Sequence, residues 1–198
     1  MSATTLVTAK EYLQRERASD VRHELIDGDM TEMVGGSETH VLVICNLVAA
    51  LHGLLRQRSE RVYASDMRVG IPNADSYTYP DIVVSAGDPQ LEDDQQDTLL
   101  NPVVLIEVLS PTTEAYDRGR KFEQYRRIPS LQEYVLVAQD RMQVECYRRR
   151  ADGWHLTEYS TASDSVPFPA LQCEVRVEEI YAKVNLSTER PQNDQQRS

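Results

Sequence analysis

The chain has 198 residues and 40% of them are hydrophobic, which is long and apolar enough for one folded domain and too apolar for a disordered chain. Its 32 acidic and 21 basic residues give a net charge of −11. This excess of carboxylates excludes a generally basic nucleic-acid coat, so a polyanion would have to bind at a local basic patch.

The cysteines and the apolar runs bear on the compartment of the protein. Cys45, Cys146 and Cys173 show no spacing typical of zinc binding, and their odd number and apolar neighbours predict reduced, buried thiols. The N-terminus has no apolar stretch typical of a signal peptide, and the longest apolar run, residues 41–51, is too short to cross a bilayer. We therefore expect a cytoplasmic protein without a membrane-spanning segment.

Two short elements are expected near the N-terminus. Thr8 and Glu11 have the spacing of a capping box, which predicts a short helix that ends at about Arg17. The segment 23–30 predicts a hairpin, because its Asp27-Gly28 pair suits a type I′ turn. The chain is therefore expected to begin with a helix and a hairpin.

A strongly apolar helix is expected over residues 40–56. Its apolar side chains recur at helical spacing, and further ones widen the stripe almost to a full circle. A helix that is apolar on most sides must be covered, either by a sheet or by a partner subunit. We expect this helix to take part in a homodimer.

The central part of the chain is rich in predicted strands. Residues 61–69 and 77–84 are expected to form two strands joined by a turn at 72–75. The acidic segment 87–98 is expected to be an exposed loop. Residues 103–109 form an almost continuous apolar run, which is typical of a central strand buried on both faces.

The C-terminal part is expected to complete a sheet flanked by helices. In order, the sequence predicts a helix over 114–128 that Pro129 ends, a strand over 133–138, a hairpin of 142–148 and 154–159, an edge strand within 166–177, and a short helix over 178–184. Residues 185–198 are polar and are expected to be disordered. The prediction is therefore a single domain over 1–184 with an α/β (or α+β) fold, in which helices flank a mixed sheet.

Glu107 is the one charged residue in the apolar run 103–109. By strand alternation it shares a face with Leu105 and Leu109, and a carboxylate in such a place is costly unless its charge is compensated. One interpretation is a structural ion pair with an arginine. The other is a metal ligand, because a divalent cation would compensate the desolvated charge.

Asp81 begins a predicted strand directly after Pro80. Alone, such a Pro-Asp pair is most often a feature of a turn or a strand start. If the strands that carry Asp81 and Glu107 are neighbours, their carboxylates come together, and two hard oxygen ligands with waters suit Mg²⁺. Such an ion polarises a phosphoryl oxygen and activates water.

Lys121 is the only lysine in the body of a chain that has 18 arginines and three lysines. On the predicted helix it belongs to the stripe with Phe122 and Tyr125 that faces the sheet. It either snorkels or pairs with a neighbouring glutamate, or it serves a crowded site where a guanidinium would not replace a compact ammonium. Arg118 and Arg120 on the same helix belong to a solvated face or to a local phosphate-binding patch.

Several motifs in fixed order resemble the Uma-two family of bacterial proteins. They are HELIDGDM at 23–30, His40, YPDIVV at 79–84, NPVVLIEVLSPTT at 101–113, DRGRKFEQY at 117–125 and EYVLVA at 133–138. The resemblance covers about residues 8–184. It implies a restriction-endonuclease-like core of the PD-(D/E)XK nuclease type, with a metal-dependent site at the sheet.

The resemblance also assigns roles to residues. It implies that Asp81 is the Asp of the motif and Glu107 its second acid, so that both would bind Mg²⁺ (or Mn²⁺). The position of the motif's lysine is held by Leu109, and we predict that Lys121 replaces that lysine from the following helix. Glu24 corresponds to the glutamate of the family's opening hairpin and would complete the acidic cluster.

His40 matches the family at the start of the apolar helix. Its role is expected to be a supporting one. At a helix start it would cap the helix, or it would hold Glu24 in place.

Three functions are compatible with these residues. The first is a Mg²⁺-dependent endonuclease acting on DNA, in which Lys121 orients or deprotonates the attacking water or stabilises the developing charge. The second is a catalytically silent binding or assembly module, favoured by the net charge and by Leu109. The third is hydrolysis of another phosphoester, in RNA or a nucleotide. No helix-turn-helix or zinc finger is present in the sequence to predict a base specificity.

Overall fold

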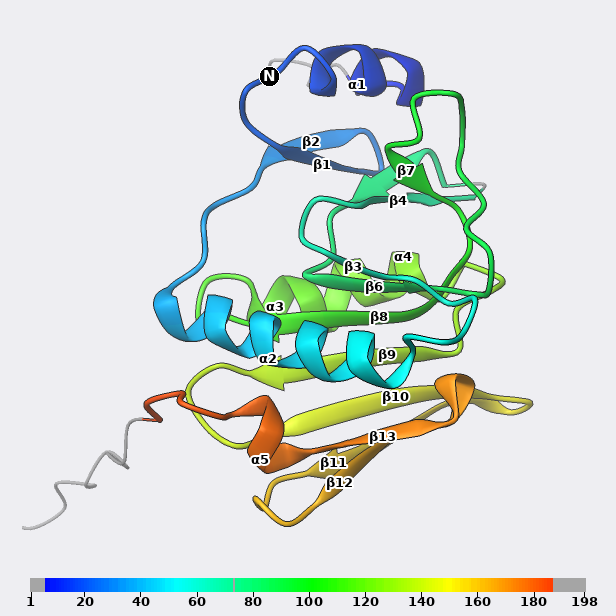
Figure 1. The fold of residues 1–198 in the computed structure, drawn as a ribbon. Helices are drawn as coiled ribbons and strands as arrows, with labels where there is room; N and C mark the ends of the chain where they lie inside the picture. Colours follow the sequence, from blue (N-terminus) through cyan, green and yellow to red (C-terminus); the bar gives the residue numbers. More distant parts are fainter. Residues whose placement is uncertain (1–5, 73, 187–198) are drawn as a thin grey trace, which may run out of the picture.

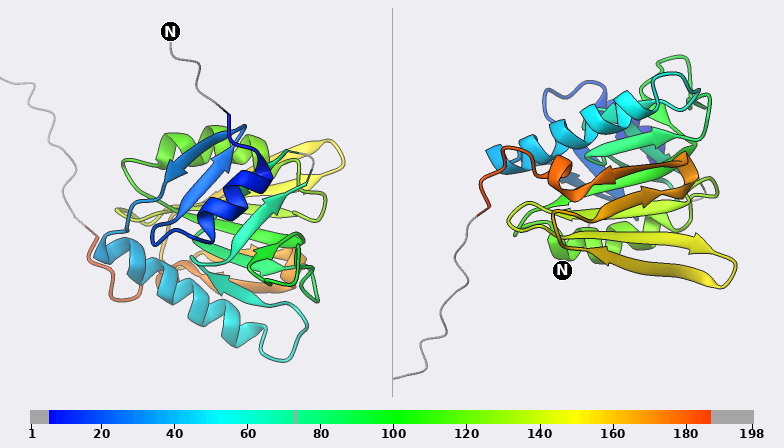
Figure 2. Two further views of the ribbon diagram at one scale, coloured as in Figure 1. Left: turned by 90° about the horizontal axis from the view of Figure 1, so that it is seen from above. Right: turned by 60° about the horizontal axis from the view of Figure 1, so that its bottom comes forward.

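Two β-sheets form the framework of the protein, and two extended segments of the chain bend from one sheet into the other (Figure 1). The computed structural model describes residues 6–72 and 74–186. The larger sheet has six strands in the order β11-β10-β9-β8-β6-β3, and the smaller has five in the order β2-β1-β5-β4-β7. A two-stranded ribbon, β12-β13, packs beside the larger sheet (Figure 2).

The larger sheet is built around one long buried strand. Its strands are β3 (Val62–Ala64), β6 (Ile82–Ser85), β8 (Pro102–Leu109), β9 (Glu133–Ala138), β10 (Val144–Arg150) and β11 (Gly153–Tyr159). β8 and β9 run parallel, and the other neighbours run antiparallel. Every residue of β8 is buried, so the prediction of a strand covered on both faces is confirmed.

The smaller sheet begins with the expected hairpin. Its strands are β1 (His23–Ile26), β2 (Asp29–Glu32), β4 (Arg68–Ile71), β5 (Ser76–Thr78) and β7 (Thr98–Leu99). Asp27 and Gly28 both have positive φ angles, 52° and 84°, as a type I′ turn requires. Helix α1 (Ala9–Glu16) packs on this sheet, where Tyr12 stacks on Tyr77, and the predicted capping box of Thr8 and Glu11 is present.

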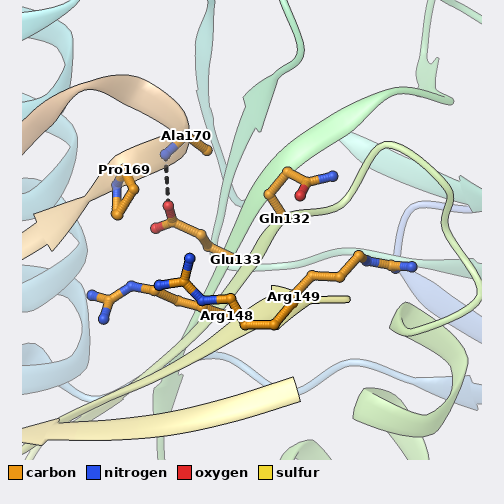
Figure 3. Close-up of a pocket in the computed structure, with 7 residues that line it drawn as sticks. Gln132, Glu133, Arg148, Arg149, Pro169 and Ala170 are labelled. Carbon is orange, nitrogen blue, oxygen red and sulfur yellow. Dashed lines mark hydrogen bonds between the residues drawn. The ribbon is translucent and has the colours of Figure 1, made fainter. Parts of the chain in front are cut away.

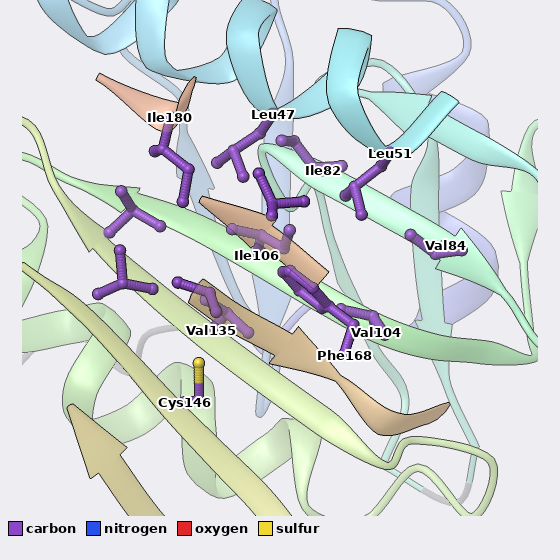
Figure 4. Close-up of a cluster of buried hydrophobic side chains, with 14 of the residues drawn as sticks. Leu47, Leu51, Ile82, Val84, Val104, Ile106, Val135, Cys146, Phe168 and Ile180 are labelled. Carbon is purple, nitrogen blue, oxygen red and sulfur yellow. The ribbon is translucent and has the colours of Figure 1, made fainter. Parts of the chain in front are cut away.

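Helices cover both faces of the larger sheet. On one face lie α2 (Glu38–Leu54) and α5 (Val177–Ile180), with Leu47 and Leu51 of α2 directed at the apolar side chains of the sheet (Figure 4). On the other face lies a helical segment made of α3 (Glu114–Tyr116), a π-helical turn (Asp117–Lys121) and α4 (Phe122–Tyr125). The sheet and α5 thus cover α2 from within the chain. Its exposed residues are Val41, Cys45 and Ala49 in the middle, with Glu38 at the start and His52, Gly53 and Leu54 at the end.

The prediction of two continuous strands at 61–69 and 77–84 is wrong, because each is divided between the two sheets. The first bends at Ser65, whose φ of 38° is left-handed, so β3 joins the larger sheet and β4 the smaller. The second bends at Pro80, which has no N–H for a ladder, so β5 joins the smaller sheet and β6 the larger. The second bend places Asp81 where the two sheets meet.

The acidic segment 87–98 is largely the exposed loop that was predicted, but it is tied to other parts of the chain. Arg17 lies 2.9 Å from an oxygen of Asp93 and 2.8 Å from one of Asp97, and buried Arg68 also pairs with Asp97 at 2.7 Å. These arginines lower the pKa of Asp97, an effect that burial opposes. Charges of distant segments therefore hold part of this loop on the protein surface.

Two smaller predictions also differ from the structure. The edge strand expected within 166–177 is a pair of strands, β12 (Ser165–Phe168) and β13 (Cys173–Arg176), joined by a 3-10 turn over Pro169–Leu171. All three cysteines are free, but only Cys146 is buried as predicted, because Cys173 is partly exposed and Cys45 is exposed. The predicted polar tail lies, from residue 187 onward, outside the described residues. In the part that the structure describes, no helix is long and apolar enough to span a membrane.

Candidate active site

Asp81 and Glu107 lie side by side at the centre of the larger sheet. β6 and β8 are antiparallel neighbours with Ile82 opposite Ile106, so Asp81 comes opposite Glu107. The Asp81 amide donates to Glu107 Oε2 over 3.4 Å, and Asp81 Oδ2 accepts a hydrogen bond of 2.7 Å from the Val108 amide. The two carboxylates are thus fixed by backbone groups of each other's strands.

Lys121 reaches the same place from the helical segment that covers this face. Its Nζ lies 3.0 Å from Glu107 Oε1, 2.9 Å from Glu24 Oε1 and 3.8 Å from Asp117 Oδ1. The side chain is only 6% exposed, so the ammonium is held between carboxylates rather than extended into water. Snorkelling is therefore wrong. The pairing with glutamates, the other structural interpretation, is present, and the role of Lys121 in a crowded functional site stays a prediction.

The helix that carries Lys121 is irregular at that residue. Asp117 and Lys121 are the first and last residues of the π-helical turn, and both are buried. Such turns are rare and are frequent at functional sites. The segment ends at Tyr125, shorter than the predicted 114–128.

Glu24 connects the smaller sheet to this cluster. Its Oε1 accepts a hydrogen bond of 3.0 Å from the Tyr79 amide, next to the bend at Pro80. Its Oε2 accepts one of 3.1 Å from the Tyr116 hydroxyl. Because Glu24 is also paired with Lys121, it joins β1, the divided strand and the helical segment.

His40 contacts Asp81 and not Glu24. Its Nε2 lies 3.1 Å from Asp81 Oδ1, and the Ser37 hydroxyl, not His40, caps α2. Burial alone would lower the pKa of His40, but the neighbouring Asp81 carboxylate outweighs that effect and raises it. Gly36 touches the ring so closely that a Cβ there would lie 2.5 Å from His40 Cδ2, so another residue would displace the imidazole.

The cluster holds more acidic than basic side chains. The carboxylates of Glu24, Glu107 and Asp117 lie around the Lys121 ammonium, and Asp81, beside Glu107, is paired with His40. Burial raises the pKa of Glu107 well above its ordinary value, against the attraction of Lys121. Burial alone would lower the pKa of Lys121, but the carboxylates raise it well above its ordinary value. Lys121 is therefore an ammonium at neutral pH.

Three residues of the cluster were not predicted as part of it. The Tyr125 hydroxyl donates to Glu107 Oε1 over 2.8 Å, Tyr116 bonds Glu24, and burial raises the pKa of Asp117 beside Lys121. A signal existed for Tyr125, since it lies in the stripe of Lys121 and a buried tyrosine usually needs a hydrogen-bond partner for its hydroxyl. Asp117 begins the motif DRGRKFEQY at 117–125 but was not assigned to the site, and nothing in the sequence pattern marks Tyr116.

Arg118 and Arg120 are both engaged within the chain. Arg118 pairs with Glu145 and lies 2.8 Å from Glu114 Oε1. Arg120 lies 2.9 Å from Asp29 Oδ2 and donates to the Ile26 carbonyl. A phosphate would have to compete with these carboxylates, and the phosphate-binding role of both arginines stays a prediction.

The donor chemistry of the site suits a hard divalent cation. Asp81 and Glu107 offer adjacent carboxylate oxygens, and Mg²⁺ is commonly bound through one or two carboxylates with its remaining positions filled by water and substrate. Over residues 6–72 and 74–186, no group of three or more His, Cys, Asp or Glu side chains is arranged to hold a metal ion. A cation here would therefore depend on the two carboxylates together with ligands from solvent or substrate.

Comparison with solved structures places the fold in a known class. The structure is similar to one from Anabaena variabilis described as "a putative nuclease belonging to DUF820", with a TM-score of 0.71 over 88% of this chain and 97% of that chain. The two sequences are 19% identical, so the similarity establishes the fold. The predicted restriction-endonuclease-like fold, a mixed α/β architecture, is thereby confirmed.

Sequence comparison identifies the family. Residues 9–178 match the Uma2 family, the Uma-two family named above, which is described as "Putative restriction endonuclease". The chain is 37% identical over 169 residues to "Uncharacterized protein sll1609" of Synechocystis sp., covering 85% of this chain and 96% of that relative. It is 35% identical over 178 residues to "Uncharacterized protein slr1290" of the same organism, covering 88% and 91%. The protein belongs to the Uma2 family.

Replacement of Lys121 by methionine tests the electrostatics of the cluster. Lys121→Met leaves buried Glu107 without its cation, and we expect a loss of about 3–5 kcal/mol in the free energy of unfolding at neutral pH. The pKa of Glu107 is already raised by burial and rises further in the variant, so the folded variant holds a proton that the unfolded chain releases. The loss therefore shrinks as the pH falls and grows as the pH rises.

Urea unfolding of both proteins at several pH values measures this effect. Lys10→Met, which removes an exposed ammonium from α1, is the matched control and should change stability little at any pH. A Lys121→Met variant as stable as the native protein, or one whose loss of stability does not depend on pH, contradicts the assignment.

Proposed function

We propose that the protein is a Mg²⁺-dependent (or Mn²⁺-dependent) endonuclease that hydrolyses phosphodiester bonds, most directly those of DNA. The observation that carries the proposal is the contact of Lys121 Nζ with Glu107 Oε1 at 3.0 Å, next to Asp81 on the neighbouring strand. This arrangement supplies the two acids and the lysine of a nuclease motif, although Leu109 occupies the usual lysine position. The family description and the fold support the same class of reaction.

The proposed roles follow from the contacts of each residue. Asp81 and Glu107 would hold the cation, which when bound polarises a phosphoryl oxygen and lowers the pKa of a water. Lys121 remains protonated at neutral pH, so of its predicted roles it orients the water and stabilises developing negative charge rather than accepting a proton. Glu24 supports Lys121 directly at 2.9 Å, and His40 orients the Asp81 carboxylate.

The acidic cluster is most exposed to solvent on one side, and a substrate would approach from that side. The side chains of His40 and Asp81 are 15% and 18% exposed, whereas that of Glu107 is 4% exposed. A phosphodiester would therefore meet the cluster at the His40 and Asp81 edge. Gly36 lies against the His40 ring at this edge, where any side chain would displace the imidazole.

Cleavage assays on plasmid DNA with Mg²⁺ or Mn²⁺ test this function. Glu107→Gln keeps the size of the side chain and removes its charge, and we expect the cleavage rate to fall at least about 100-fold, the scale typical of losing one electrostatic group at an active site. Glu158→Gln, at an exposed glutamate of β11, should cleave at the native rate.

Two outcomes would contradict the proposal. A Glu107→Gln variant with the native cleavage rate would exclude the assigned site. Absence of metal-dependent cleavage of DNA by the native protein, with no heat of Mg²⁺ or Mn²⁺ binding at millimolar concentration, would favour the catalytically silent binding module. Metal-dependent cleavage of RNA or a nucleotide but not of DNA would keep the assigned site and change its proposed substrate.

We also propose that the protein is a homodimer that uses α2. Val41, Cys45 and Ala49 are exposed at four-residue spacing and leave an apolar stripe on this helix. Light scattering of the native protein at micromolar concentration should give the mass of two chains, and Ala49→Glu should give that of one. A native monomer would contradict the dimer without affecting the nuclease site.

A further inference from the structure

A cavity of about 250 Å³ opens on the face of the larger sheet opposite the acidic cluster (Figure 3). Its floor is the start of β9 and the end of β10, and Pro169 and Ala170 form one wall. Glu133 lies on the same face of β9 as Val135 and Val137, the face that α2 covers, whereas Glu107 lies on the opposite face of the sheet, toward the helical segment of Lys121. The cavity is thus separate from the proposed nuclease site.

Glu133 brings a buried carboxylate into this cavity. The residue is 2% exposed, and its Oε1 accepts a hydrogen bond of 2.8 Å from the Ala170 amide. Its Oε2 is buried and has no hydrogen-bond partner among the described residues. A buried carboxylate oxygen without a partner is unfavourable, so the site is incomplete as the chain alone forms it.

Arg148 lies directly across from Glu133 in the ladder of β9 and β10. Its Nη2 donates to the Pro167 carbonyl over 2.7 Å, which directs the guanidinium away from an ion pair with Glu133. Its Nε is buried and, in the described part of the chain, has no hydrogen-bond partner. Both atoms lie buried beneath the surface of the cavity, so a bound group would reach this unused acceptor and this unused donor only when the two side chains turn toward it.

Arg150 adds charge at the exposed end of the cavity. It lies two residues beyond Arg148, hence on the same face, and is exposed. Arg149 between them points the other way (Figure 3). Its guanidinium binds the carbonyls of Leu131 and Ile128. Within the described residues none of the three arginines at the cavity forms an ion pair, and Arg148 and Arg149 bind carbonyl oxygens, whereas the Arg150 guanidinium forms no hydrogen bond there.

We propose that this cavity binds a nucleoside monophosphate, with the base edge between Glu133 and Arg148 and the phosphate at Arg150. The edge of a nucleobase carries a hydrogen-bond donor next to an acceptor, which matches the free Glu133 Oε2 and Arg148 Nε. The volume is slightly below that of most drug-sized ligand sites, so it admits a base and leaves the phosphate at the entrance. A simple anion would satisfy the arginines but not Glu133.

Calorimetric titration of the full-length protein in the absence of divalent cations tests this site. The probes are GMP, AMP, CMP and UMP, with ribose 5-phosphate and inorganic phosphate as ligands that lack a base. At least one nucleotide should bind with a Kd below about 1 mM, and the ligands without a base should bind at least about tenfold more weakly.

Three variants locate the binding. Glu133→Gln keeps an oxygen for the Ala170 amide but replaces the free acceptor by a donor, and Arg150→Ala removes an exposed side chain at little risk to the fold. Each should weaken the binding at least about tenfold. Arg141→Ala, at an exposed arginine of the turn between β9 and β10, should bind like the native protein.

The outcomes separate this proposal from the nuclease proposal. Binding that persists in Glu107→Gln and is lost in Arg150→Ala supports the cavity. Absence of nucleotide binding, equal binding of inorganic phosphate, or native affinity in both Glu133→Gln and Arg150→Ala would overturn it; water alone would then satisfy the buried atoms. None of these results depends on DNA cleavage.

Discussion

The ion pair between Lys121 and the buried carboxylate of Glu107 is the interaction on which the arrangement of the protein's centre depends. β8 is buried along its whole length, so an uncompensated charge at Glu107 would be strongly destabilising. The covering helical segment must therefore place Lys121 at this point of the sheet, and its π-helical turn ends at that residue. Tyr125, one turn further on, donates its hydroxyl to the same carboxylate and fixes its orientation.

The same pair explains why the smaller sheet is joined to the larger one. Lys121 has a second carboxylate partner, Glu24, which comes from the hairpin almost a hundred residues earlier in the chain. Glu24 in turn binds the Tyr79 amide, beside the Pro80 bend at which the chain passes from one sheet to the other. The bend places Asp81 against Glu107, so the four charged groups are assembled by one ion pair and one divided strand.

The features that could be predicted from the sequence are those that depend on a few neighbouring residues. The capping box of α1, the Asp27-Gly28 turn and the apolar run around Glu107 are all local, and the structure has each of them. The isolated charge in that run marked Glu107, but the pattern alone predicted an arginine or a metal as its partner. The meeting of Lys121 with Glu107 was predicted with the help of the family resemblance. The family resemblance added Glu24 and His40, which strand and helix patterns do not mark.

Features that depend on distant partners could not be predicted in this way. The division of the strands at Ser65 and Pro80 is decided by which sheet each half pairs with, and a period-two pattern is the same on both sides of a bend. The pairing of Asp97 with Arg17 joins segments 80 residues apart. The pairing of Arg118 with Glu145 likewise depends on how a helix docks onto β10, which no local pattern encodes.

A crystal structure of the protein soaked in Mn²⁺ tests the central claim most directly. The account predicts an anomalous peak about 2.1 Å from a carboxylate oxygen of both Asp81 and Glu107, the distance typical of a small divalent cation, with Lys121 still in contact with Glu107. A peak located elsewhere, no peak at these carboxylates, or a Lys121 ammonium withdrawn from Glu107 would contradict it.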